Sequence, residues 1–200
     1  MTARISLLLA LMLVTACSTT APSSPAAANA PAIDYLPGPG PYDFDCDAPT
    51  GTDRQASIRL PNGPWRARGQ LQFLTTRDDP RWEPTVLIHV LDSKSYDVLL
   101  VLWVYRGDHA VRMVFATAET LLPDDYVMGS MRLTSAQVPF ELVIDPAGKI
   151  SASVGGVAMP VSLKIAGSSR LMLQCSTARV RFSNVTLEKR TRAVEQPIAR

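Results

Sequence analysis

Hydrophobic and polar residues follow short, strand-like patterns through most of the chain after about residue 40. Alternation with a period of two is typical of a half-buried strand, and a short continuous apolar run is typical of a strand buried on both faces. The pattern predicts strands over Arg66–Leu74, Thr85–Leu91, Tyr96–Tyr105, His109–Thr117, Phe140–Asp145, Ile150–Val154, Val161–Ile165, Leu171–Cys175 and Arg179–Leu187.

Turn-forming residues separate these strands at short and fairly regular intervals. Examples are Pro61-Asn62-Gly63-Pro64, Gly107-Asp108 and Gly155-Gly156. Many short strands between such turns are typical of an all-β sandwich or barrel. No segment shows a convincing helical period, although Ala118–Met131 is ambiguous. We therefore predict an all-β fold, a two-sheet antiparallel β-sandwich.

One hairpin can be predicted in register. The apolar run Val98–Tyr105 is followed by Arg106, the dipeptide Gly107-Asp108 and His109, which favours a two-residue turn. This register places the following pairs opposite each other on one apolar face: Val104 and Val111, Leu102 and Met113, and Leu100 and Phe115. That face is expected to lie in the core between the two sheets.

The other face of this hairpin carries the candidate binding residues. Trp103 is expected opposite Arg112, with Tyr105 one step along the strand. An aromatic ring beside a guanidinium on an outer sheet face suits ligand binding. The same pair also fits a cross-strand cation–π contact that covers the sheet and binds nothing.

The first residues of the chain carry an export signal. Arg4 precedes an apolar run, Ile5–Val14, which is too short to span a bilayer and has the length of a signal-peptide core. The run leads into Val14-Thr15-Ala16-Cys17, which resembles the lipobox of bacterial lipoproteins. The resemblance implies that residues 1–16 are removed and that Cys17 is lipidated, with palmitate among its acyl chains. Ser18 after the cysteine implies an outer-membrane destination, with the side that the domain faces left open.

Composition divides the remainder. Residues 17–41 are rich in Pro, Ala and Ser, bury little apolar surface and are expected to be a linker. Residues 42–189 are expected to form the β-sandwich domain, and the basic residues 190–200 a disordered tail. The whole chain has a formal net charge of only +2. A nucleic-acid partner is therefore not expected, because phosphate binding needs a concentrated basic face.

Two cysteines remain besides Cys17. Cys46 and Cys175 lie near the two ends of the predicted domain. An even pair of cysteines in an exported chain favours a disulfide, with two free buried thiols as the alternative. Such a bridge would close most of the domain into one loop and place its two ends side by side.

The later strands resemble those of the concanavalin A-like lectin and glucanase jelly rolls. The resemblance rests on Pro139–Asp145, Gly148–Gly156, Leu171–Cys175 and Val180–Val185. It implies two curved sheets with adjacent N- and C-terminal strands, a domain that binds carbohydrate on its concave face or rim loops, and hydrolysis of glycans in some members.

Catalytic chemistry is not evident in the sequence. Glycoside hydrolysis needs two carboxylates across one bond, and the Glu-x-Asp-x-x-Glu pattern of the jelly-roll glucanases is missing, since Glu83, Glu119 and Glu141 are isolated from one another. His89 and His109 have no nucleophile motif beside them. We predict no catalytic residues and, on balance, no enzyme.

Metal binding is also not favoured. Asp43, Asp45 and Asp47 share one face of an extended segment, which suits either calcium or, more often, a solvated edge strand. We predict no metal and no cofactor.

Three functions stay open at this stage. The first is a lipid-anchored, non-catalytic envelope protein that binds a glycan or cell-wall polymer. The second is a structural or assembly lipoprotein that contacts another envelope protein, and the third, less favoured, is a glycan hydrolase.

Overall fold

The computed structural model describes residues 32–36, 40–91, 98–104, 109–117, 129–159, 163–164 and 170–190. Cys17, Tyr105, Glu119, residues 1–31 and residues 191–200 lie outside these ranges. The strands are β1 (Ala32–Tyr35), β2 (Tyr42–Asp47), β3 (Asp53–Arg59), β4 (Trp65–Thr76), β5 (Thr85–Leu91), β6 (Val98–Val104), β7 (Ala110–Thr117), β8 (Gly129–Arg132), β9 (Val138–Ile144), β10 (Lys149–Val154), β11 (Val157–Ala158), β12 (Leu163–Lys164), β13 (Arg170–Ser176) and β14 (Ala178–Lys189). In these ranges, no helix is long and apolar enough to cross a membrane.

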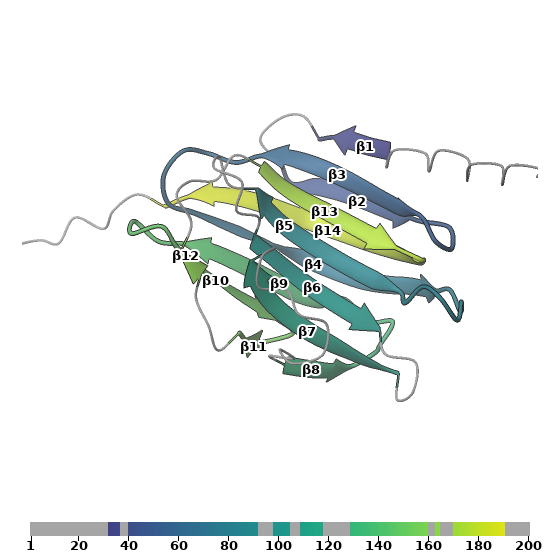
Figure 1. Cartoon of the computed structure of the whole chain (residues 1–200). Coiled ribbons are helices and arrows are strands. Elements are labelled where there is room, and N and C mark those ends of the chain that lie inside the picture. Colours follow the sequence, from purple (N-terminus) through teal and green to yellow (C-terminus); the bar gives the residue numbers. More distant parts are fainter. Residues whose placement is uncertain are drawn as a thin grey trace, which may run out of the picture. The chain divides into compact units, whose positions relative to one another are not determined.

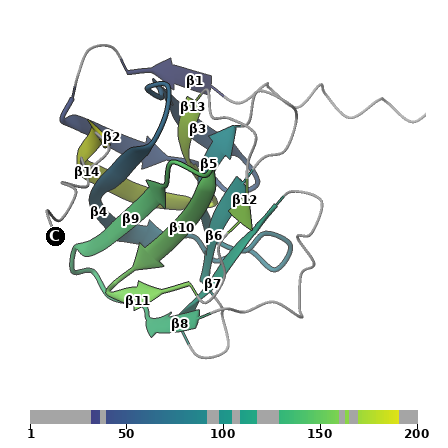
Figure 2. The ribbon, with the colours of Figure 1, turned by 90° about the vertical axis from the view of Figure 1, so that its left-hand side faces the viewer.

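The strands form two sheets stacked as layers (Figures 1 and 2). Sheet A has the order β1-β3-β13-β5-β6-β7-β8. Sheet B has the order β11-β10-β9-β4-β14-β2, with β12 pairing β10. Among the described strands every pairing is antiparallel except that of β1 with β3. The predicted two-sheet antiparallel sandwich is confirmed.

The core lies between the two sheets because alternate residues of each strand point inward. β4 buries every second residue from Trp65 to Phe73, and β9 does the same from Val138 to Ile144. Phe182 of β14 packs near two other rings, with centroids 6.1 Å from Phe44 and 6.3 Å from Phe140. Aromatic pairs at this separation add to the stabilisation from buried area.

The predicted hairpin register is confirmed. β6 and β7 pair Val104 with Val111, Leu102 with Met113, and Leu100 with Phe115, and all six residues are buried in the main core. On the other face Leu99, Val101, Val114 and Ala116 form a second, smaller buried cluster. β6 is therefore buried on both faces, as its continuous apolar sequence predicts.

The predicted disulfide is also confirmed. Cys46 of β2 and Cys175 of β13 are bonded, with their Cα atoms 6.0 Å apart. The bridge joins sheet B to sheet A. β2 also pairs directly with β14. These are the first and last strands of sheet B in chain order, so the N- and C-terminal strands of that sheet are neighbours, as the jelly-roll resemblance implies.

Some strands were not predicted from the sequence. β1 lies within the segment expected to be linker, and the compact unit of the structure begins at Pro31. β1 is held by its ladder to β3, by the Leu36 N–H donating to the Ser57 carbonyl at 3.1 Å, and by an Arg54–Asp34 ion pair at 2.8 Å. β3 shows no alternation in burial because Gln55 and Ser57, which face away from the core, are buried as well.

Candidate functional site

The outer face of sheet B is polar. In β4 the residues between the buried ones are Arg66, Arg68, Gln70 and Gln72, and their side chains point away from the core. β9, β10 and β14 alternate in the same way, so strands distant in sequence present their polar side chains on one surface. This face is the solvated side of an antiparallel sheet.

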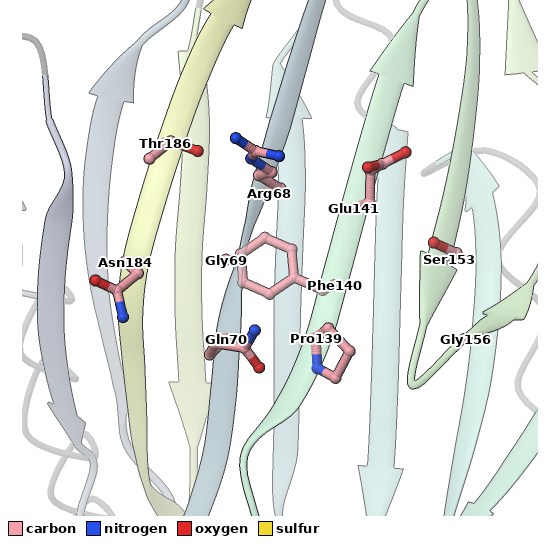
Figure 3. A pocket seen from close by; sticks show the side chains of 10 residues that line it. All are labelled: Arg68, Gly69, Gln70, Pro139, Phe140, Glu141, Ser153, Gly156, Asn184 and Thr186. Atoms are coloured by element: carbon pink, nitrogen blue, oxygen red, sulfur yellow. The ribbon is translucent and has the colours of Figure 1, made fainter.

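A groove of about 560 Å³ lies across this face (Figure 3). Its lining residues come from β14, β4, β9, β10 and the turn after β10: Arg68, Gly69, Gln70, Pro139, Phe140, Glu141, Ser153, Gly156, Asn184 and Thr186. Figure 3 shows Gln70 and Arg68 on the central strand, with Asn184 and Thr186 on one side and Pro139 and Glu141 on the other. The volume lies in the usual range for a small-molecule site.

An irregularity in the sheet shapes the middle of the groove. Gln70 of β4 pairs with Ser183 of β14 and Arg68 pairs with Thr186, so Asn184 and Val185 together lie opposite Gly69. Two residues opposite one is a β-bulge, which bends a strand and re-aims its side chains. Asn184 has a positive φ of 52°, and its N–H donates to Asp43 Oδ1 at 2.8 Å. The bulge thereby brings the Asn184 amide to the groove.

Gly69 is required by close packing at the same point. A Cβ on Gly69 would lie 2.9 Å from Cε1 of Phe140 and 3.0 Å from Cγ2 of Val185. Contacts that short are not tolerated without movement of the neighbours. The glycine therefore lets the Phe140 ring lie directly against β4 beneath the groove.

Several charged side chains of this face are arranged in ion pairs. Arg68 Nη2 lies 2.5 Å from Glu188, and Arg66 Nε lies 3.6 Å from Glu141. Beyond the groove, Arg181 donates to both carboxylate oxygens of Asp45, at 2.6 and 3.0 Å. The hydrogen bond from Arg181 holds the pKa of Asp45 below its ordinary value and raises that of Arg181. Opposite charges therefore offset one another across the face.

Hydroxyl and amide groups make up the rest of the groove's polar lining. Gln70 and Asn184 each offer two donors and a carbonyl acceptor, and Ser153 and Thr186 offer hydroxyls. Thr186 Oγ1 is buried and makes no hydrogen bond to the described part of the chain. A buried polar atom without a partner in a groove is a candidate contact for a ligand hydroxyl.

The groove lacks the pair of groups that hydrolysis needs. Among its lining residues that the structure describes, Glu141 is the one carboxylate, and none is a histidine, tyrosine, cysteine or lysine. A general acid and a second carboxylate across one bond are therefore not assembled here.

The residues predicted from the sequence lie on the opposite layer. Trp103 pairs directly with Arg112 on the outer face of sheet A, as the hairpin register predicts. Both side chains are half-buried, and Trp103 packs against the second apolar cluster of that face. The structure thus brings Trp103 and Arg112 together, whereas Tyr105 lies outside the described residues.

The acidic row of β2 is tied to other residues. Asp43 accepts the Asn184 N–H, Asp45 binds Arg181, and Asp47 binds Arg77. In the described ranges, no group of three His, Cys, Asp or Glu residues is placed to hold a metal ion. His89 lies on the outer face of sheet A, opposite Met172 and Leu99, and His109 is exposed at the start of β7.

Sequence reasoning missed the groove and one exposed aromatic residue. Gln70 and Asn184 are 114 positions apart in the sequence and become neighbours only through the β4–β14 register. Gly69, inside the alternating segment Trp65–Thr76, was the one available signal of the groove. Glycine inside a strand often marks a bulge or a close approach of another chain segment. Trp82, half-exposed in the loop between β4 and β5, was not singled out either.

Comparisons with known proteins identify no family. No family model matches the chain, and no curated protein matches it. Among solved structures, a carbohydrate-binding module, CBM66 from Bacillus subtilis, aligns with a TM-score of 0.43 and 10% identity, over 68% of this chain and 82% of the module. An alginate lyase from Pseudomonas aeruginosa aligns with a TM-score of 0.46 and 17% identity, over 64% of this chain and 65% of the lyase.

A third structural match is a CBM2 module of a Lactobacillus casei phage protein, with a TM-score of 0.44 and 5% identity, over 72% of this chain and 74% of the module. The chain spans just under two thirds of the length of the alginate lyases it matches. Similarity at this level gives no information about substrate or activity.

Proposed function

We propose that this chain is a lipid-anchored envelope protein whose β-sandwich binds a glycan or cell-wall polymer without cleaving it. The ligand lies in the groove on the outer face of sheet B. The anchor is Cys17 at the outer membrane, as expected from the sequence, and the membrane is therefore a second partner.

One observation carries the proposal: the groove's polar lining suits a polyhydroxylated ligand. Sugar hydroxyls both donate and accept hydrogen bonds, and so do the side-chain amides of Gln70 and Asn184 and the hydroxyls of Ser153 and Thr186. Arg68 is already paired with Glu188, so a strongly anionic ligand is not needed to neutralise it. A few convergent polar groups in an open groove give orientation and specificity to a bound molecule.

Non-catalytic binding is favoured over hydrolysis because the described lining residues include a single carboxylate, Glu141. That carboxylate lies 3.6 Å from the Arg66 guanidinium. Glycoside hydrolysis needs a second carboxylate across the same bond, and the described lining residues do not supply one.

The test is a binding measurement on the soluble domain beginning at Pro31, where the compact unit starts. Barley β-glucan, xylan, dextran, inulin and alginate are used as soluble probes, with peptidoglycan sacculi as the insoluble one. We expect the Gln70→Ala/Asn184→Ala variant to bind at least about tenfold more weakly than the wild type to the polymer that the wild type retains. Gln174→Ala, which removes a half-buried amide from β13 in the other sheet, is the matched control.

Two results would contradict the proposal. One is retention of none of these polymers by the wild type, which would favour the structural lipoprotein, whose test is crosslinking to one dominant envelope protein in intact cells. The other is an equal loss in the groove variant and in Gln174→Ala. Trp103→Ala tests the face predicted from the sequence, because a loss confined to that variant would place the ligand on sheet A.

A further inference from the structure

Trp82 is an unusually exposed side chain for this fold. Half of its surface is accessible, whereas Trp65 is fully buried. Among the residues that the structure describes, one other large hydrophobic side chain is exposed to solvent, that of Val157 on β11. A single exposed hydrophobic residue is common on protein surfaces, so what distinguishes Trp82 is how its ring is held in place.

The loop that carries Trp82 is held in a fixed turn. Asp79 Oδ1 accepts the N–H of Arg81 at 2.8 Å, and the Asp79 carbonyl accepts the N–H of Trp82 at 3.4 Å. The hydrogen bond from the Arg81 backbone lowers the pKa of Asp79, so the carboxylate that forms the turn stays ionised at neutral pH. An aspartate bonded to the backbone two residues later is a common way of fixing a turn.

Gly51 supports the indole from a second loop. Its φ is +70°, and a Cβ added there would lie 3.1 Å from Nε1 of Trp82 and 3.4 Å from Cδ1. Glycine at this position therefore satisfies two requirements at once: a left-handed backbone and close contact with the ring. The Trp82 ring therefore lies close to the backbone of Gly51.

The two loops are fastened to the disulfide end of the sandwich. The Gly51 N–H donates to Thr177 Oγ1 at 3.2 Å, and the Thr177 carbonyl accepts the Arg77 N–H at 3.1 Å. Arg77 also donates to the Ala48 carbonyl at 2.6 Å. Thr177 follows the bridged Cys175 by two residues. Trp82 is consequently presented on a pre-organised base, which reduces the entropy lost when a ligand binds.

We propose that Trp82 is a stacking platform for one sugar ring of a glycan, a second contact site separate from the groove on sheet B. The inference takes its ligand class from the proposed function, but none of the residues around Trp82 lines the groove. The C–H face of a pyranose is apolar and packs on an aromatic face. Trp supplies such a surface at low entropic cost.

The surroundings of Trp82 favour a sugar over a protein surface. Its chain neighbours Arg81 and Glu83 are exposed, and a guanidinium and a carboxylate can both hydrogen-bond hydroxyl groups around a stacked ring. A stable protein interface has an extended core of apolar contacts, with roughly 800 Å² buried on each partner. A single indole between charged residues does not supply such a core.

The experiment is a titration of the ¹⁵N-labelled Pro31–Arg200 protein with soluble β-glucan, xylan, dextran, inulin, alginate and a muramidase digest of peptidoglycan. The Trp82 indole N–H and the side-chain amides of Gln70 and Asn184 are followed separately. We expect the Trp82 signal to shift with at least one probe. We also expect Trp82→Ala to weaken binding of that probe about tenfold while leaving the circular dichroism spectrum unchanged.

The outcomes separate the two proposals. A shift of the groove amides while the Trp82 signal stays fixed overturns this inference and leaves the proposed function standing. A shift of Trp82 alone supports this inference and contradicts binding in the groove. No shift at either place with any probe overturns both.

Gly51→Ala and Gly63→Ala form a matched pair of variants for the same inference. Both glycines have positive φ, +70° and +89°, but no atom lies within 4 Å of a Cβ added at Gly63. Both substitutions strain the backbone, and only Gly51→Ala pushes on the indole. We expect only Gly51→Ala to shift the Trp82 resonance in the free protein and to weaken glycan binding. Equal effects in the two variants would show that Gly51 does not position Trp82.

Discussion

The disulfide between Cys46 and Cys175 should be the largest single contribution to the stability of this domain that one pair of substitutions can remove. It joins the edge strand β2 of sheet B to β13 within sheet A, and both residues are fully buried. β2 has β14 as its ladder partner in sheet B, and the bridge adds a covalent link to β13 in sheet A. The change to make is the double substitution Cys46→Ala/Cys175→Ala, which leaves no buried polar thiol.

The size of the effect follows from the loop that the bridge closes. The two cysteines are 129 residues apart. In the chain-entropy treatment, a loop of that length restricts the unfolded state by about 5 kcal/mol at 25 °C. A loss of this size in a domain of roughly 150 residues lowers Tm by about 10–20 °C.

The assay is urea unfolding at 25 °C together with scanning calorimetry, comparing the oxidised wild type with the double-alanine variant. A difference in unfolding free energy below about 1 kcal/mol would refute the reasoning. Reduction kinetics give an independent check. Because both sulfurs are buried, we expect alkylation of the cysteines in dithiothreitol to accelerate with urea in step with unfolding.

Two further substitutions test the outer face of sheet B. Gly69→Ala should destabilise the domain by about 1–3 kcal/mol, measured by urea unfolding, because the new Cβ would lie 2.9 Å from the Phe140 ring; an unchanged midpoint would contradict the packing argument. Asp45→Asn should lower the unfolding free energy by at most about 1 kcal/mol at pH 7, since its ion pair with Arg181 is exposed to solvent. The folded-state pKa of Asp45 lies below 3.8, so this difference should persist above pH 3.8 and vanish as the pH falls through the lowered value; a difference that grows in acid would contradict it.

The sequence was sufficient to predict the strands whose two faces differ, or whose residues are apolar throughout. β4, β9 and β14 were predicted because alternate residues face the core, and β6 because apolar residues cover both of its faces. The β6–β7 register followed from a short turn of fixed length. The Cys46–Cys175 bond was predictable because only two cysteines remain after Cys17.

Features that depend on contacts between distant segments could not be read from local patterns. β3 escaped prediction because its alternating segment is short and contains one large apolar residue, Ile58, while polar Gln55 and Ser57 are buried only through contacts with other segments. β1 is a short strand in a proline-rich context, and its pairing with β3 joins segments that no local pattern connects. The groove forms only when β14, β4, β9 and β10 lie side by side. Trp82 lies against Gly51, which is 31 positions earlier in the sequence.

The irregular point of the β4–β14 ladder offers a way to separate stability from recognition. Gly69 contributes no side chain to the core, and Asn184 opposite it has a left-handed backbone, φ 52°. Glycine in a strand and a bulge each weaken a regular ladder. Both occur in the middle of the two longest strands and at the centre of the groove. Gly69 meets the packing of Phe140, so the feature left to test is the bulge residue Asn184, which lines the groove.

Asn184→Gly should therefore lower glycan binding without lowering stability. Glycine adopts the left-handed conformation freely, so the unfolding free energy should stay within about 1 kcal/mol of the wild type, while the side-chain amide is lost from the groove. His109→Gly is the matched control, since His109 also has a positive φ, of 51°, but is exposed just before β7 and does not line the groove. Binding retained by Asn184→Gly, or lost equally in both variants, would mean that the bulge serves the fold and not the ligand.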